Sequence, residues 1–248
     1  MSKITKLVIP TTAPSPARST KWNKGLTLQS ADLLEPMSAA SNDTTRYVLN
    51  GICFDKDSII GTDGRRLLRI VHDVTPLMHG KEPTILPNDK QTVRFIKDAP
   101  MLRIQLSTDG QWFKLTAFGR EHCVKKVAGQ YPNWRQVLPE SKNRWHLTFD
   151  SEQVAKVLRD LPVDKKQPAA TIEFRDGYSK ATVGKTSVLF HCVGNAAATI
   201  RLNAIMLAQA VKQGFATAYL NMDKLEEPVL FTKANAAYVQ MPMVMKAS

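Results

Sequence analysis

The sequence predicts an α+β fold made of two similar domains, each with two helices and antiparallel sheets in repeated units. The first observation is that a stretch with helical spacing of apolar residues, followed by strand-like runs, occurs four times along the chain. The second is that Asp109-Gly110 and Asp176-Gly177 each lie between two strand-like runs, which is typical of antiparallel hairpins. Four copies of one unit indicate internal pseudo-symmetry, and pairs of copies make two domains.

The first half of the chain contains two helix signals. A helix is predicted over residues 30–42, because Ser30 suits the N-cap position and the apolar residues that follow fall on one face. A second helix is predicted over 87–98, with Pro87 in its first turn, where proline is favoured. The strands predicted in this half are 47–54, 58–71, 102–107, 112–117 and 121–127.

The second half repeats this order. A helix is predicted to begin at Asp150 or Ser151, and another to cover 203–213. The strands predicted in this half are 171–174, 179–183, 188–193, 217–221, 229–232 and 237–241. A polar stretch at 139–143 follows a proline and marks the predicted boundary between the halves. The two domains are therefore predicted to cover 26–140 and 141–248.

Residues 1–25 are predicted to form a basic, flexible tail. The segment 10–20 is rich in Pro, Ser and Thr, a composition typical of extended, mobile chain. Residues 4–9 alone have the pattern of a short edge strand. The tail contains no acidic residue, and its cations are Lys3, Lys6, Arg18, Lys21 and Lys24.

The chain is strongly basic, with 34 Lys and Arg against 22 Asp and Glu and a formal net charge of +12. An excess of this size attracts polyanions, of which nucleic acid is the leading candidate and an anionic membrane surface the second. A protein that is merely basic is the third interpretation. No apolar run is long enough to span a bilayer and no secretory signal is present, so a soluble, cytoplasmic protein is expected.

The sequence offers no catalytic constellation. Cys53, Cys123 and Cys192 stand far apart, which favours buried thiols over a disulfide framework or a zinc site. The five histidines form no metal-binding spacing, and no phosphate-binding or nucleophile motif is present. We therefore expect no enzyme activity, no metal and no cofactor.

Four motifs, in order and in register, resemble those of the bacterial DNA polymerase III beta subunit, the sliding clamp. The motifs are Arg46-Tyr47-Val48-Leu49-Asn50-Gly51, Thr62-Asp63-Gly64-Arg65-Arg66-Leu67, Tyr131-Pro132-Asn133-Trp134-Arg135 and Ala237-Tyr238-Val239-Gln240-Met241-Pro242-Met243. The resemblance covers about residues 26–245. The first half is similar to the middle domain of that family and the second half to its last domain, so the resemblance implies two DNA-clamp domains and a non-catalytic processivity factor.

The resemblance also implies a pocket that receives short peptides of polymerases and of the clamp loader. Carried over residue by residue, one wall is Leu49, Thr62, Gly64, Arg65, Arg66, Leu67, Pro132 and Val137. The other wall is Asn203, Met206, Val239, Met241, Pro242 and Met243. Leu, Val, Pro and Met make an apolar slot for leucine or aromatic anchors, and the arginines suit acidic peptide residues. The competing interpretation is that these apolar residues are core and that the Thr-Asp-Gly-Arg-Arg stretch is only a turn.

Two domains per chain imply a particular ring. In the family, six domains encircle double-stranded DNA, so three copies of this chain, joined head to tail, would supply the same number. Cations on the helices would meet the phosphates without reading bases. The candidate DNA-binding residues are Lys90, Arg94, Lys97, Lys156, Arg159, Lys165, Lys166 and Lys212.

Three alternatives remain open at this point. One is a clamp-like DNA-binding accessory protein that does not close a ring. Another is an interaction module that competes for clamp-binding peptides. The third is an enzyme, for which Gly61-Thr62-Asp63-Gly64 superficially matches a nucleic-acid-binding GxxG loop, although it lies between strand-like runs. Ring closure separates the sliding clamp from the first two, and DNA affinity separates those two from each other.

Overall fold

A computed structural model describes residues 15–142, 144–166 and 168–243 of the chain. Its α-helices are α1 (Ser30–Ala39), α2 (Lys90–Lys97), α3 (Ser151–Leu158) and α4 (Ala204–Lys212). Short 3₁₀ helices cover Thr44–Leu49, Thr75–Leu77 and Trp134–Val137. The strands of the first half are β1 (Leu26–Gln29), β2 (Gly51–Asp55), β3 (Ser58–Thr62), β4 (Arg66–Val71), β5 (Thr84–Pro87), β6 (Met101–Leu106), β7 (Trp112–Ala117) and β8 (Arg120–Lys125). The strands of the second half are β9 (Trp145–Phe149), β10 (Ala169–Phe174), β11 (Gly177–Val183), β12 (Thr186–Gly194), β13 (Ala198–Asn203), β14 (Thr217–Leu220), β15 (Val229–Lys233) and β16 (Ala236–Gln240).

The element order is one unit repeated four times, as the sequence predicts. Each unit consists of a strand, an α-helix and three more strands, with short 3₁₀ helices in some of the connections. The predicted α+β class with antiparallel sheets is confirmed, since every named strand pair is antiparallel. The sequence analysis missed the first strand of every unit. Each of them pairs with a strand of another unit, so the partners that stabilise it lie far away in the sequence.

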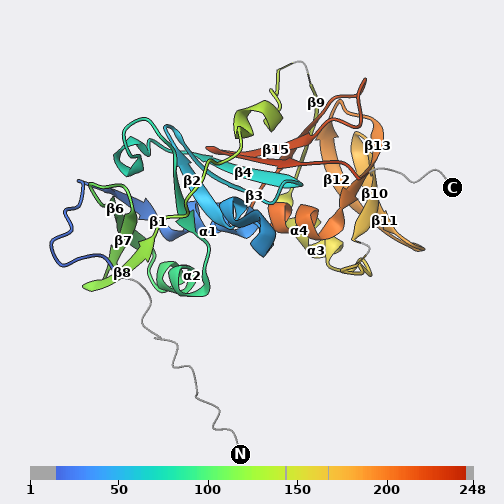
Figure 1. The fold of residues 1–248 in the computed structure, drawn as a ribbon. Coiled ribbons are helices and arrows are strands. Elements are labelled where there is room, and N and C mark those ends of the chain that lie inside the picture. Colours follow the sequence, from blue (N-terminus) through green and yellow to red (C-terminus); the bar gives the residue numbers. More distant parts are fainter. Residues whose placement is uncertain (1–14, 143, 167, 244–248) are drawn as a thin grey trace, which may run out of the picture.

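The strands form two sheets. A four-stranded sheet has the order β1-β6-β7-β8, and a twelve-stranded sheet runs β13-β10-β11-β12-β9-β14-β15-β16-β4-β3-β2-β5. The long sheet crosses from one half of the chain to the other where β16 pairs with β4 (Figure 1). Tyr238 lies opposite Leu68 in this pairing. We call this pairing the internal seam. Because the sheet is continuous across it, the domain division near residue 140 stays a prediction.

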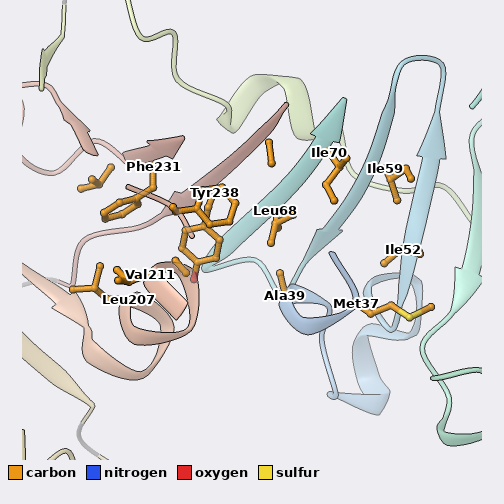
Figure 2. Packing of buried hydrophobic residues seen from close by; sticks show 14 of the residues in the cluster. Met37, Ala39, Ile52, Ile59, Leu68, Ile70, Leu207, Val211, Phe231 and Tyr238 are labelled. Atoms are coloured by element: carbon orange, nitrogen blue, oxygen red, sulfur yellow. The ribbon is translucent and has the colours of Figure 1, made fainter. Parts of the chain in front are cut away.

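α1, α3 and α4 cover one face of the long sheet, and α2 packs on α1 and on β8 of the short sheet. α1 packs on β3 and β4, and α4 packs on β16, so the two helices lie on either side of the internal seam. Figure 2 shows Leu68 and Tyr238 directed from the sheet toward these helices, where Tyr238 approaches Leu207 and Val211. This main core is continuous through both halves. Burial of such apolar area is the principal term that stabilises the fold.

A smaller apolar cluster lies on the opposite face of the same seam. Successive strand residues point to opposite faces, so Leu67 and Val239 face away from the helices although their neighbours Leu68 and Tyr238 face them. The linker between β8 and β9 crosses this face and contributes Tyr131 and Trp134. The members of this linker cluster are Cys53, Ile60, Leu67, Ile85, Tyr131, Trp134, Leu230 and Val239.

Two helix starts differ from the prediction. The N-cap of α1 is Gln29, and Ser30 is already inside the helix. α2 begins at Lys90, because Asp89 accepts hydrogen bonds from the backbone N–H groups of Gln91 and Thr92. The predicted start at Pro87 is wrong, since that residue ends β5 and pairs with Gly51. The N-caps of α3 and α4, Asp150 and Asn203, accept equivalent bonds, and Asp150 was one of the predicted starts.

Two predicted strands in the first half are also wrong. Residues 44–49 form a 3₁₀ helix, so the strand expected from 47 starts only at Gly51. The strand expected over 58–71 is two strands, because the chain reverses at Asp63, Gly64 and Arg65. Gly64 has a φ of +85°, a conformation that glycine adopts without the cost of a side chain.

Part of the predicted flexible tail is packed against the fold. Trp22 forms a β-bridge with Ser107, and the Lys114 ammonium lies 5.0 Å from the Trp22 ring centre. Asn23 Oδ1 accepts a hydrogen bond of 2.9 Å from the backbone N–H of Leu106. The prediction is therefore wrong for residues 21–25, since composition gave no sign of these distant partners. Residues 1–14, with the possible edge strand, lie outside the described residues.

Candidate functional site

A cavity of about 140 Å³ opens on the linker face of the internal seam. It is bounded by the β3–β4 turn, the linker and the end of β16. Ten of the residues expected in the peptide pocket line it, namely Leu49, Thr62, Gly64, Arg65, Arg66, Leu67, Pro132, Val137, Val239 and Met241. The structure thus brings together residues from opposite ends of the folded chain.

The β3–β4 turn is held by its own side chains. Thr62 Oγ1 accepts a hydrogen bond of 3.0 Å from the Gly64 N–H, and its hydroxyl donates to the carbonyl of Arg66. Asp63 Oδ1 accepts the N–H groups of Arg65 and Arg66 at 2.9 and 3.1 Å. Asp and Thr favour such local bonds in turns. The stretch is therefore both a turn, as the competing interpretation has it, and one edge of the cavity.

The two arginines of this turn differ. The Arg66 guanidinium lies 3.1 Å from Asp63 Oδ2 and also donates to the Ser38 carbonyl at 2.8 Å and to Gln209. These bonds tie α1, β4 and α4 together, so they occupy the donors of Arg66 within the chain. Arg65 is exposed at the cavity rim, and its carbonyl accepts the Met241 N–H at 3.0 Å. Of the two, Arg65 is the arginine placed to meet an acidic ligand group.

The linker wall is anchored by a tryptophan that the pocket prediction left out. Trp134 is 4% exposed and donates from Nε1 to Asp55 Oδ2 at 2.9 Å. The guanidinium carbons of Arg135 and Arg69 lie 4.2 and 5.2 Å from its ring centre, and Arg135 also pairs with Asp55. Buried carboxylates require such partners. Trp134 and its neighbour Asn133 line the cavity and both belong to the quoted linker motif, which was the available signal.

The cavity has a buried apolar floor and an exposed apolar rim. Leu67 and Val239 in the floor are each 2% exposed, whereas Val137 and Met241 at the rim are 48% and 41% exposed. A concave apolar surface with few polar groups suits the burial of leucine or aromatic side chains. Exposed rim side chains of this size provide contact area that a ligand would cover.

Four residues predicted for the second wall lie outside this cavity. Pro242 and Met243 line a neighbouring hollow of about 390 Å³, which shares Met241 with the first. Met206 borders a polar hollow beside Arg46 and Arg65. Asn203 caps α4, and its backbone carbonyl accepts a hydrogen bond of 2.9 Å from Gln240, which is a structural role.

The same arrangement of elements occurs in solved structures. The beta sliding clamp of C. crescentus matches with a TM-score of 0.77 at 18% identity, over 94% of this chain and 68% of that one. The chain has the sliding-clamp fold. The DNA polymerase III subunit beta of Bartonella birtlesii, bound to griselimycin, matches with a TM-score of 0.78 at 18% identity, over 94% of this chain and 69% of that one. The DNA polymerase III subunit beta of Borrelia burgdorferi, in complex with a natural product, matches with a TM-score of 0.77 at 16% identity, over 94% of this chain and 66% of that one. Neither a protein-family model nor a curated protein matches the sequence.

On this clamp fold, the eight candidate DNA-binding cations are all exposed. Lys90, Arg94 and Lys97 share one face of α2, opposite the buried Thr92 and Ile96. Lys156, Arg159, Lys165 and Lys166 lie on or after α3, and Lys212 ends α4. Within residues 15–142, 144–166 and 168–243, none of the eight forms an ion pair.

The cysteines lie apart from one another. Cys53 and Cys192 are buried and Cys123 is half-buried, and all three are free thiols. Burial raises the pKa of the Cys53 thiol well above its usual range, which keeps it protonated. Among the described residues, no group of His, Cys, Asp and Glu is arranged to hold a metal ion, and no helix has the length and apolar character needed to cross a bilayer.

Proposed function

We propose that the chain is the subunit of a DNA sliding clamp, a non-catalytic processivity factor that encircles double-stranded DNA and holds a partner enzyme there. The observation that carries the proposal is the sliding-clamp fold, which matches over 94% of the chain, and the apolar cavity at the internal seam supports it. The fold alone does not define a function. The cavity adds a site that suits short peptides with leucine or aromatic anchors.

The charge of the molecule supports DNA as the encircled ligand. The net charge is +12, and exposed cations lie on α2 and on the helices that cover one face of the long sheet. Cations on helices meet phosphates independently of sequence, which suits a protein that slides. The cavity lies on the other face of the sheet. A partner bound there, a polymerase or a clamp loader, would therefore leave the basic helices facing DNA.

The ring is proposed to contain three chains. Each chain supplies two of the predicted domains, so three copies joined head to tail give the six domains of a closed ring. The mass in solution tests this proposal, since a trimer is three times 27.6 kDa. Light scattering over a range of concentrations should show that mass. A monomer at every concentration, with and without DNA, would overturn the ring.

A topological experiment distinguishes encirclement from ordinary binding. The assembled protein, loaded on a nicked circular plasmid, should stay bound in high salt and be released when the plasmid is cut once. Release from the circle and the linear form at equal rates would contradict the ring and favour an accessory protein that binds DNA without closing. Absence of DNA binding, with retention of peptide binding, would favour the competing interaction module.

The α2 cations provide a test of the DNA contact. Replacing Lys90, Arg94 and Lys97 together by Gln should weaken binding and reduce the slope of log K against log salt by up to about 3. The matched control replaces three exposed lysines in turns, Lys81, Lys142 and Lys185, by Gln and changes the net charge equally. An equal loss of DNA affinity in both variants would mean that only the net charge of the protein, and not the position of the α2 cations, determines binding.

A further inference from the structure

The four-stranded sheet β1-β6-β7-β8, the short sheet, has one basic face. Residues alternate along β6, so that Ile104 lies in the main core and Arg103 lies on the opposite, outer face. The strand register places Trp112, Lys114 and Lys125 on the same outer face as Arg103. Cations and an indole ring therefore lie together on the side of this sheet that faces away from the core.

A second indole ring lies at the edge of this face. Trp22 forms a β-bridge with Ser107, next to the end of β6. The Lys114 ammonium lies 5.0 Å from the Trp22 ring centre, so the ring rests on the outer face. Trp22 and Trp112 are both half-buried, and each ring keeps part of its surface accessible to solvent.

The cations of this face are mostly uncompensated. Among the strand positions of β6, β7 and β8 on the outer face, Glu121 is the single acid, and it pairs with Lys114 at 3.5 Å. Arg103 and Lys125 are exposed and form no ion pair within the described residues. The Arg103 guanidinium donates to the Lys24 carbonyl at 2.7 Å, which ties a further exposed lysine to this face. Such an excess of positive charge attracts a polyanion.

The corresponding face of the second half is apolar and covered. The β7–β8 and β15–β16 hairpins have turns of the same length, and their closing pairs are Ala117 with Arg120 and Lys233 with Ala236. Counting back three residues from the first member of each pair, Lys114 takes the place of Leu230. Leu230 is 4% exposed and belongs to the linker cluster. The basic face is therefore a feature of the short sheet and not of the repeated unit.

This face also lies apart from the α2 cations. α2 meets β8 through His122, whose ring stacks on Phe95 with centroids 5.6 Å apart and whose Nε2 lies 3.0 Å from Thr92 Oγ1. His122 neighbours Cys123 in β8 and so points to the other face of the sheet. Figure 1 shows the short sheet at one end of the molecule, away from β10, β11 and β13. A ligand on the outer face is thus separate from a duplex that meets the helices.

A sheet face with indole rings and cations suits unpaired bases. Aromatic rings stack on bases and cations contact phosphates without reading the sequence. Four-stranded sheets with aromatic side chains on the open face bind single-stranded RNA in this way. A duplex keeps its bases stacked inside and offers mainly its phosphates to such a face. An acidic protein segment would likewise leave the indole rings without a stacking partner.

We propose that the outer face of the short sheet binds single-stranded DNA. Trp22 and Trp112 stack on bases, and Arg103 and Lys125 contact phosphates. This site goes beyond the proposed clamp, because it holds an unpaired strand outside the ring, whereas the helices meet the duplex inside it.

The phosphate contacts are tested with a labelled oligothymidylate and the full chain, by fluorescence anisotropy over a range of salt concentrations. Arg103→Gln combined with Lys125→Gln should weaken binding and reduce the slope of log K against log salt by up to about 1.4, since each contact on a single strand contributes about 0.7. The matched control combines Lys142→Gln with Lys185→Gln, at exposed positions outside the short sheet, and should bind almost as the wild type does.

An abasic oligonucleotide of the same length separates stacking from charge. It keeps the sugars and phosphates but lacks the bases, so it should bind at least about tenfold more weakly than oligothymidylate. Trp112→Leu keeps an apolar side chain on the sheet and should reduce this preference for the intact oligonucleotide. Equal affinities of the wild type for both oligonucleotides would overturn the stacking site.

The α2 variant distinguishes this site from the proposed ring. Lys90→Gln, Arg94→Gln and Lys97→Gln together should weaken duplex binding and leave oligothymidylate binding unchanged, and the Arg103 and Lys125 variant should do the reverse. Loss of oligothymidylate binding in the α2 variant alone, or equally in both, would place the single strand on the helices and overturn the proposal.

Two further outcomes would also overturn this site, and both leave the clamp proposal intact. One is an affinity for oligothymidylate that the Arg103→Gln and Lys125→Gln substitutions do not change. The other is competition by polyglutamate as strong as that by unlabelled oligothymidylate, which would indicate a surface for acidic proteins.

Discussion

The β3–β4 and β11–β12 hairpins reverse the chain over the same number of residues but have different surroundings. Thr62-Asp63-Gly64-Arg65 and Thr182-Val183-Gly184-Lys185 each reverse the chain through a glycine with positive φ. The first hairpin has β16 on its edge and the linker across its outer face, and it borders an apolar cavity. The second has an exposed Leu189 and a free edge within the described residues.

The comparison shows that the turn alone is not sufficient to form the cavity. The cavity needs a second strand to supply Val239 and Met241, and a linker to supply Pro132 and Val137. Both come from parts of the chain far from the hairpin in sequence. The repeated hairpin therefore borders an apolar cavity in one half of the chain and has an uncovered edge in the other, within the described residues.

The largest effect is expected from removal of the linker anchor, which only the first hairpin has. Trp134→Ala leaves a cavity in the linker cluster and deprives Asp55 of a hydrogen-bond donor, so unfolding free energy should fall by about 3–5 kcal/mol. Urea denaturation measures this. The matched control is Trp145→Ala, since Trp145 is 45% exposed and should change stability little. An equal loss of stability in both variants would show that Trp134 contributes no more to the fold than an exposed tryptophan does.

The next effect concerns the cavity rim. Met241→Ala removes an exposed apolar contact and should weaken binding of a leucine- and phenylalanine-containing peptide about tenfold, with little change in stability. Fluorescence anisotropy of a labelled peptide measures the affinity. Met101→Ala is the control, because Met101 on β6 is 55% exposed and lies outside the cavity. If both variants bind like the wild type, the peptide site lies elsewhere.

The two turn glycines separate backbone strain from pocket shape. Gly64→Ala and Gly184→Ala both place a side chain at positive φ, so each should lose roughly 1 kcal/mol of stability. An added Cβ at Gly64 lies 3.1 Å from the Arg46 guanidinium and borders the cavity, whereas at Gly184 it meets nothing within 4 Å. Only Gly64→Ala should also weaken peptide binding. Equal peptide affinities would show that the turn does not shape the site.

The smallest effect is a pH dependence of the linker contacts. Burial acts to raise the pKa of Asp57, but the Ser58 hydrogen bond and the Arg69 charge outweigh it and hold the pKa below its ordinary value. A carboxyl with a lowered folded-state pKa stabilises the fold above its unfolded value of about 3.9, and that stabilisation is lost as the pH falls through the folded value. Wild type and Asp57→Asn should therefore differ in unfolding free energy near pH 6 by less than about 1 kcal/mol and converge as the pH falls below the folded-state pKa of Asp57. A difference in unfolding free energy that does not depend on pH would indicate a change in packing and not in charge.

Local chemistry explains most of what the sequence determined. Helical spacing and an N-cap such as Asp150 identify α3, and Asp109-Gly110 identifies the β6–β7 hairpin, because these signals act between residues close in the chain. The fourfold repeat also follows from the order of such signals. The same local reading failed at residues 47–49, which belong to a 3₁₀ helix and not to the predicted strand.

Only the tertiary structure decided how the repeats meet. The first strand of each unit forms because a distant strand completes its hydrogen bonds, and the cavity exists because β16 and the linker reach β4. The resemblance to clamps named most of the pocket residues, but it did not show that Arg66 is engaged by Asp63, Ser38 and Gln209. Contacts between residues far apart in the chain depend on the completed fold. The sequence alone therefore determined the four units, and the tertiary structure determined which strands pair between them.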